Sequence, residues 1–175
     1  MEKRAADRDK TSRLTALYGM MIALAVLFSY VEMLIPLNLG IPGVKLGLAN
    51  LVTIVAFYTI GVKEAVAITL VRIVLVGITF SNLFSMLYSL AGGELSLILM
   101  ILCRKRDWYG QTGVSIVGGV GHNVGQLIVA AIVVENTAVF YYFPYLLVAG
   151  IIAGMLIGIL GGIVVNRLSR FIRNL

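Results

Sequence analysis

Long apolar runs alternate with short polar interruptions along the chain. About 20 apolar residues in an α-helix cross the ~30 Å hydrocarbon core of a bilayer. The apolar runs predict six membrane spans, at residues 13–35, 45–61, 64–80, 83–103, 112–134 and 144–166. The sequence therefore predicts an all-α, polytopic membrane bundle of six helices at residues 13–166. The charged flanks at residues 1–12 and 167–175 are expected to be a mobile basic N-terminus and a basic C-terminal tail.

The fifth run contains polar residues that a bilayer tolerates only under special conditions. It includes "GGVGHNVGQLIV", residues 118–129, with the single histidine of the chain. At about 100° per residue, four residues share a ~60° sector of this helix: Ser115, Gly119, His122 and Gln126. Asn123 lies at the edge of that sector. Because polar groups facing lipid stay unsatisfied, this face must turn into the bundle, as interhelical contacts, a ligand-facing wall or a proton relay.

The fourth run repeats this pattern. Small and polar residues gather on one side of it at helical spacing: Ser85, Ser89, Gly92, Gly93 and Ser96. The two polar faces are expected to confront each other and line a ligand site. Arg72 in the third run and Glu94 in the fourth lie at similar depth, and an intramembrane charge usually has a partner. We expect them to pair, either at the ligand site or as a purely structural ion pair.

The connection between the first two runs, "IPLNLGIPGVKLGLANL", is interrupted by proline and glycine. It indicates a loop of fixed shape followed by Lys45 and Asn50. These two residues either cover a ligand site and attract anionic groups, or belong to a short connection whose lysine merely reaches the interface.

Composition and charge support this picture. Apolar residues make up 60% of the chain and charged residues 13%, and the mean hydropathy is +1.01. With a cytoplasmic N-terminus, the basic residues of the chain collect on that side, apart from Lys45 and Arg72. This distribution predicts cytoplasmic termini and explains the net charge of +6 by topology and lipid contact rather than nucleic-acid binding. A single cysteine excludes an internal disulfide, and no cluster of ligands predicts a metal.

Several motifs, in order, resemble one family of small membrane proteins. They are "ALYGMMIALAVLFSYVEMLIP", "PGVKLGLANLVT", "LVRIVLVG", "FSMLYSLAGGELSLILM" and "GHNVGQLIVAAI", within residues 13–166. The family is known both as Gx transporters and as heptaprenyl diphosphate synthase component I, and it is similar to the substrate-binding S components of energy-coupling factor (ECF) transporters.

The resemblance implies a subunit in the bacterial cytoplasmic membrane that captures a small vitamin-like or cofactor-precursor molecule. Such subunits dock on a membrane scaffold (T) subunit driven by two cytoplasmic ATPases. Docking uses small residues of the first helix, which correspond here to Ala16, Gly19 and Ala23. The alternative for these residues is ordinary packing inside the bundle.

The second family name suggests prenyl chemistry, which the residues do not support. Prenyl chain elongation needs aspartate-rich motifs that hold Mg²⁺, whereas Asp7, Asp9 and Asp107 all lie in the predicted cytoplasmic flanks and loops. No GxxxxGK phosphate loop is present, and no acid is placed to complete a Ser-His arrangement with His122. We therefore expect no catalysis and no cofactor. The alternative to import is a noncatalytic membrane partner in prenyl diphosphate or quinone metabolism, or in flavin-linked electron transfer.

Overall fold

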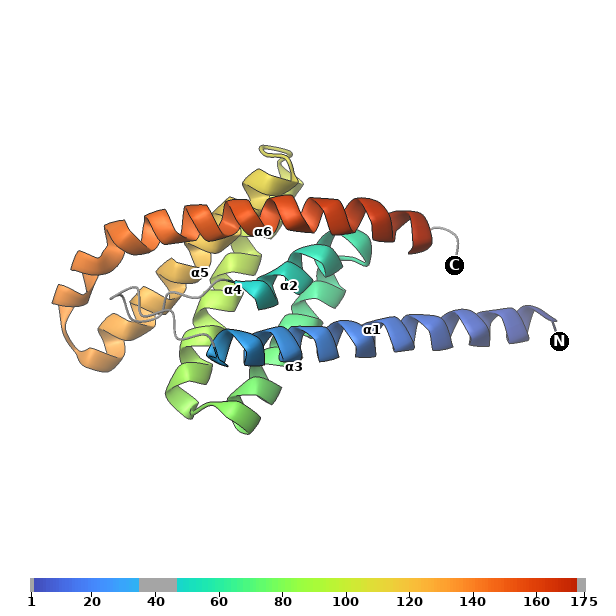
Figure 1. Ribbon diagram of the computed structural model, residues 1–175, viewed down its shortest axis with the longest axis horizontal. Helices are drawn as coiled ribbons and strands as arrows, with labels where there is room; N and C mark the ends of the chain where they lie inside the picture. Colours follow the sequence, from blue (N-terminus) through green and yellow to red (C-terminus); the bar gives the residue numbers. More distant parts are fainter. Residues whose placement is uncertain (1, 35–46, 173–175) are drawn as a thin grey trace.

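The computed structural model describes the backbone of residues 2–34 and 47–172, and the side chains of residues 11–34 and 47–170. Within these ranges the chain is helical and contains no strand, which confirms the all-α prediction (Figure 1). The helices, in chain order, are α1 (Glu2–Leu34), α2 (Leu48–Thr59), α3 (Val62–Phe80), α4 (Leu83–Lys105), α5 (Gln111–Val134), the short 3-10 helix η1 (Thr137–Tyr142) and α6 (Phe143–Ile172).

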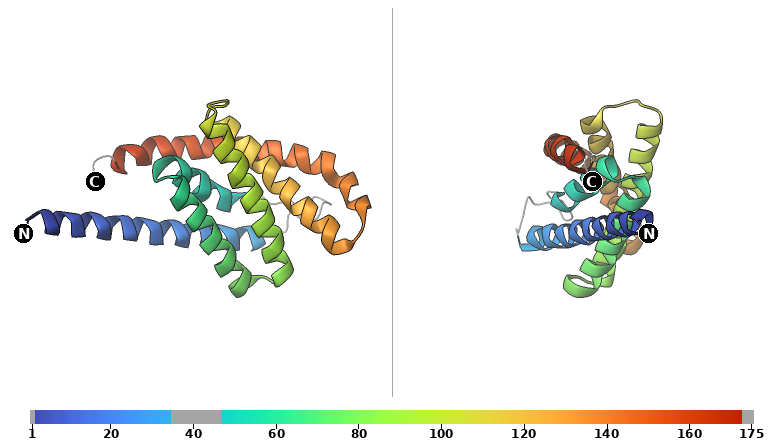
Figure 2. Two further views of the ribbon diagram at one scale, coloured as in Figure 1. Left: turned by 180° about the vertical axis from the view of Figure 1, so that it is seen from behind. Right: turned by 90° about the vertical axis from the view of Figure 1, so that its right-hand side faces the viewer.

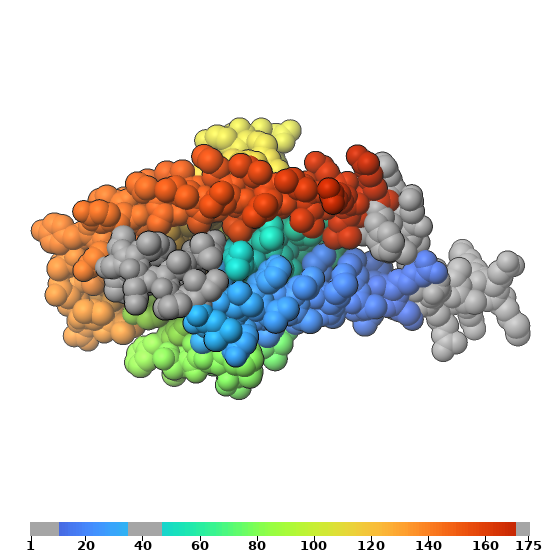
Figure 3. Space-filling model, viewed as in Figure 1, coloured from blue at the N-terminus to red at the C-terminus, as the bar shows by residue number. Residues whose placement is uncertain are grey.

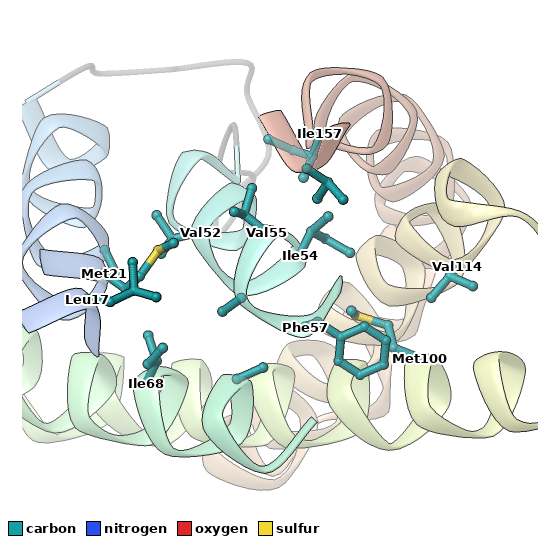
Figure 4. Packing of buried hydrophobic residues seen from close by; sticks show 14 of the residues in the cluster. Leu17, Met21, Val52, Ile54, Val55, Phe57, Ile68, Met100, Val114 and Ile157 are labelled. Atoms are coloured by element: carbon teal, nitrogen blue, oxygen red, sulfur yellow. The ribbon is translucent and has the colours of Figure 1, made fainter. Parts of the chain in front are cut away.

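Helix α2 lies at the centre of the bundle, between α1 and α6 (Figure 3). Its residues Val52 to Phe57 are all buried. Apolar side chains of the other helices surround it, as Figure 4 shows for Met21 of α1, Ile68 of α3, Met100 of α4 and Ile157 of α6. A short, mainly apolar helix is therefore the core of the protein, and the longer helices cover it.

Glycines let α5 and α6 approach backbone to backbone. Gly150, Gly154 and Gly158 follow one another at intervals of four residues along one stripe of α6. A Cβ atom at Gly154 would lie 2.6 Å from the Cα atom of Ile116 in α5, and one at Gly119 would lie 2.5 Å from the carbonyl oxygen of Gly150. Contacts this short leave no room for a side chain, so these glycines fix the spacing of the two helices.

The start of α1 and the end of α6 lie at the same end of the molecule (Figures 1 and 2). Near this end Arg104, at the end of α4, donates a hydrogen bond to the carbonyl oxygen of Phe57. Its guanidinium also stacks on the rings of Phe57 and Tyr58, 4.9 Å from each centroid. Arg104 therefore satisfies a free carbonyl at the C-terminal end of α2, where a cation is favoured.

Among the described residues, four helical segments are long and apolar enough to cross a membrane: Thr11–Leu34, Leu83–Lys105, Gln111–Val134 and Thr137–Arg170. The chain is therefore a multi-pass membrane protein. The predicted span at 64–80 forms as part of α3, and this helix carries Lys63, Glu64 and Arg72. The described part of the span at 45–61 is α2, whose 12 residues reach only about 18 Å. The number of six spans stays a prediction, and α1 and α6 continue as helices into the charged flanks.

Candidate functional site

A cavity of about 90 Å³ lies among the helices, and all six α-helices or their first flanking residues contribute to its wall. We call it the polar cavity because many of its lining side chains can form hydrogen bonds: Ser29, Glu32, Asn50, Arg72, Ser81, Ser85, Ser89, His122 and Asn123. It lies toward the ends of α1 and α3 and the starts of α2 and α4, away from the helix ends near Arg104. The pairs α1–α2 and α3–α4, which connect at this end, therefore both contribute to the polar cavity.

Arg72 is the most deeply buried charged side chain described, with 7% of its surface exposed. Its Nε atom has no hydrogen-bond partner. The acidic residue whose charge acts on it is Glu32 of α1, which also lines the polar cavity. Glu32 in turn accepts a hydrogen bond of 2.7 Å from the backbone N–H of Leu48, at the start of α2. One carboxylate therefore serves both the arginine and the end of the central helix.

The expected pair of Arg72 with Glu94 is not formed. Glu94 is exposed on the outer side of α4 and does not line the polar cavity. The neighbouring Gly92 and Gly93 are buried against other helices, and Glu94 follows two residues after Gly92, about 200° around the helix. Similar depth along two helices did not imply contact, because α4 turns its glycine side inward and its carboxylate outward.

His122 and Gln126 of α5 lie against Gly92 of α4. This contact confirms the prediction that the fourth and fifth helices face each other. A Cβ atom at Gly92 would lie 2.8 Å from the carbonyl oxygen of His122, 2.9 Å from its Nδ1 atom and 3.0 Å from Cγ of Gln126. The two side chains then separate. His122 lines the polar cavity, whereas Gln126 lines a neighbouring groove.

This lateral groove has a volume of about 520 Å³ and lies between α4, α5, η1 and the start of α6. Its walls are mainly apolar and aromatic: Phe84, Tyr88, Leu127, Ala130, Val134, Val139, Tyr142 and Leu146, with Asn82, Ser85 and Gln126 as the polar members. Ser85 also lines the polar cavity. A polar space and an apolar space therefore adjoin at one serine of α4.

A second, inner cavity of about 30 Å³ continues from the polar cavity toward the core, and both share Gly47, Asn50, Gly119 and Ala153. Hydroxyl groups line it, and those of Thr53 in α2 and Thr69 in α3 lie 3.0 Å apart in a buried hydrogen bond. Because the two hydroxyl groups form a hydrogen bond with each other, they stabilise the contact of α2 with α3. The polar cavity is the larger of the two spaces.

The structure brings most of the predicted ligand residues together. Asn50, Arg72, Ser85, Ser89, His122 and Asn123 all line the polar cavity. Gly93 lines the inner cavity, Gln126 the lateral groove, and Gly92 the contact with His122. Asn123 also donates a 2.7 Å hydrogen bond to the carbonyl oxygen of Leu146, so it ties α5 to α6 as well. Lys45 lies outside the described residues.

Sequence reasoning missed the contribution of α1 to the polar cavity. Ser29 and Glu32 line it from the C-terminal end of that helix. The signal was present, because Leu17, Met21, Ala25 and Ser29 recur every four residues and are all buried. Glu32 follows Ser29 by three residues, on the same side of the helix.

The small residues expected to dock a partner face away from the bundle. Ala16, Gly19 and Ala23 are exposed, and a Cβ atom at Gly19 would meet nothing within 4 Å. The core side of α1 is the opposite stripe, which includes Met21 and Ala25. The small residues therefore take no part in the packing of the described bundle, and their side of α1 is open to lipid or to another helix.

Comparison with known proteins gives one match. The family described as heptaprenyl diphosphate synthase component I matches residues 21–164. No curated protein and no solved structure matches the chain. The matched region extends from within α1 to within α6, so it contains the whole described wall of the polar cavity.

Proposed function

The chain belongs to the heptaprenyl diphosphate synthase component I family, and from this premise we propose that it is the substrate-binding membrane subunit of an ECF-type importer. Its substrate is a small vitamin-like or cofactor-precursor molecule, and it performs no catalysis itself. The observation that carries the proposal is the polar cavity among all six helices. Fixed polar groups that orient the ligand are a regular part of a small-molecule site.

The import cycle needs partners that supply ATP hydrolysis. A membrane scaffold subunit and two cytoplasmic ATPases are the partners proposed here. The exposed side of α1 with Ala16, Gly19 and Ala23 supports docking, because small residues permit close approach of a second helix. The polar cavity lies at the other helix ends from Arg104 and Lys105, so the positive-inside rule favours a cavity that faces outward from a bacterial cytoplasmic membrane. In that orientation both termini are cytoplasmic.

A second candidate is a noncatalytic membrane partner in prenyl diphosphate or quinone metabolism, or in flavin-linked electron transfer. The lateral groove of about 520 Å³ favours the prenyl and quinone cases, because its walls suit an apolar chain. Its Ser85 connects it to the polar cavity, where a polar head would lie. We favour import because the polar cavity, with Arg72, His122 and Asn123 in its wall, suits a small polar molecule better than an apolar chain.

Mass spectrometry of small molecules that copurify with the detergent-solubilised protein tests both candidates. A vitamin-like compound supports import, and an isoprenoid or quinone supports the alternative. Ser89→Leu should fill the polar cavity and remove the compound, whereas Glu94→Leu places the same side chain on the outer side of α4 and should retain it. Equal retention in both variants would mean that the compound binds outside the polar cavity.

A further inference from the structure

The positive charge of Arg72 is buried without a full set of hydrogen-bond and ion-pair partners among the described residues. The side chain is 7% exposed, its Nε atom has no hydrogen-bond partner, and no described acidic residue is in ion-pair contact with it. A cation in the membrane interior costs at least ~2.5 kcal/mol and is usually paired. Since the side chain lines the polar cavity, a group bound in that space would lie beside the guanidinium.

Glu32 acts on the charge of Arg72 from a distance but makes no ion-pair contact with it. Its carboxylate acts on Arg72 electrostatically but is held by the backbone N–H of Leu48, at 2.7 Å. The start of α2 lies beside them: Gly47 provides no side-chain cap, the first turn contains no acidic residue, and the carboxylate of Glu32 is the acceptor for Leu48 N–H. Gly47 and Asn50 both line the same cavity. The buried arginine, the start of α2 and the Glu32 carboxylate thus border one space, and the arginine is the donor there that makes no ion-pair contact with a described residue.

The volume of the polar cavity limits what can enter. About 90 Å³ corresponds to roughly three water molecules at ~30 Å³ each, which is less than the ~300 Å³ of a site for a whole ligand. We infer that the polar cavity takes the anionic end of its ligand, a carboxylate or a phosphate, on Arg72 beside the N-terminus of α2. This inference rests on the proposed substrate-binding role and names the chemical class of the substrate.

Acetate and inorganic phosphate are probes small enough to test the site, with acetamide as the neutral counterpart of acetate. Each is titrated into purified, delipidated protein while thermal unfolding is followed, with sodium chloride keeping the ionic strength constant. We expect acetate or phosphate, but not acetamide, to stabilise the parent protein with a measurable dissociation constant. A response to neither anion, or an equal response to acetate and acetamide, overturns the inference.

Three variants assign the response to the site. Arg72→Gln should weaken anion binding at least tenfold, because it removes the charge and the fork of donors. Glu32→Gln should tighten it several-fold, since the repelling charge is lost while an acceptor for Leu48 N–H remains. Lys63→Gln removes an exposed charge at the opposite end of α3 and should leave binding unchanged. If Arg72→Gln does not fold, unchanged or weaker binding in Glu32→Gln alone refutes the inference.

Two further experiments complete the test. The first distinguishes a lipid headgroup from a free ligand as the source of the anion, and the second distinguishes failure of the anionic class from failure of the proposed binding function. In nanodiscs, competition of phosphatidylglycerol with acetate, abolished by Arg72→Gln, supports the site and assigns it to a lipid headgroup. Absence of competition supports the site and assigns it to a free ligand. A neutral compound that copurifies and is lost in Ser89→Leu, combined with no anion response, would retain the binding function and refute the anionic class.

Discussion

The contact of α5 with α6 gives a prediction whose sign depends on how much space surrounds a glycine of α6. Gly154 and Gly162 lie two turns apart on α6, but only the first is pressed against α5. A Cβ atom at Gly154 would lie 2.6 Å from Cα of Ile116 and 2.7 Å from the carbonyl oxygen of Ser115. At Gly162 the nearest atom is Oε1 of Gln111, at 3.9 Å. The substitutions Gly154→Ala and Gly162→Ala therefore add the same methyl group to different surroundings.

The two substitutions share one favourable contribution. Alanine stabilises the middle of a helix by up to about 1 kcal/mol relative to glycine. At Gly162 this gain stands alone, because 3.9 Å is ordinary contact with a flexible side chain. At Gly154 the methyl group meets backbone atoms that no rotamer change can move, and overpacking costs about 1–3 kcal/mol. The expected result is a loss of up to about 2 kcal/mol for Gly154→Ala and no loss for Gly162→Ala.

Thermal unfolding in a single detergent measures this difference. At about 2–4 °C per kcal/mol for a chain of this size, Gly154→Ala should lower the melting temperature by several degrees, and Gly162→Ala should keep or raise it. The α5–α6 contact adjoins the polar cavity at Gly150 and Gly119, so Gly154→Ala should also weaken retention of a copurifying ligand. Equal melting temperatures for the two variants would refute the close backbone contact.

Three other predictions concern orientation, docking and the ligand. A cysteine introduced at Arg106 should resist an impermeant reagent in intact cells, and labelling there would reverse the proposed orientation. Gly19→Leu or Ala23→Leu should abolish copurification with a scaffold subunit while ligand binding survives; unchanged recovery in both would refute docking through this side of α1. His122→Ala should weaken ligand binding about tenfold, on the order of 1.4 kcal/mol, and Gln126→Ala should do so only for a ligand that enters the lateral groove. Earlier melting with unchanged affinity in both would make these residues interhelical contacts.

The sequence predicted the helices well, because membrane helices are encoded by long apolar runs. The fourth span was expected at 83–103 and α4 is Leu83–Lys105; the fifth was expected at 112–134 and α5 is Gln111–Val134. It also predicted that these two helices face each other through glycines, since small residues at helical spacing are useful only where backbones approach. The contact of Gly92 with His122 is the result.

Contacts that depend on how several helices are arranged could not be predicted from the sequence. Periodicity places a residue on a side of its own helix but does not say which neighbour that side meets. Glu32 follows the buried stripe of α1, yet only the structure shows that α1 lies beside α3 and brings this carboxylate to Arg72. The central position of α2 was equally hidden, because a short apolar run reads the same in a core as in a bilayer.

Two double-mutant cycles test whether Glu32, rather than Glu94, is the acid that acts on Arg72. Arg72→Gln with Glu94→Gln should be additive in thermal stability, because Glu94 is exposed on the far side of α4. Arg72→Gln with Glu32→Gln should cost less than the sum, because once one charge is gone the other has less to balance. Glutamine keeps an acceptor for Leu48 N–H, so the second cycle isolates charge from the hydrogen bond at the start of α2. A coupling of about 0.5 kcal/mol or more in the Glu32 cycle only is the expected result. Coupling in the Glu94 cycle instead would show that α4 turns its carboxylate inward in the membrane, and the assignment of the polar cavity to Arg72 and Glu32 would fail with it.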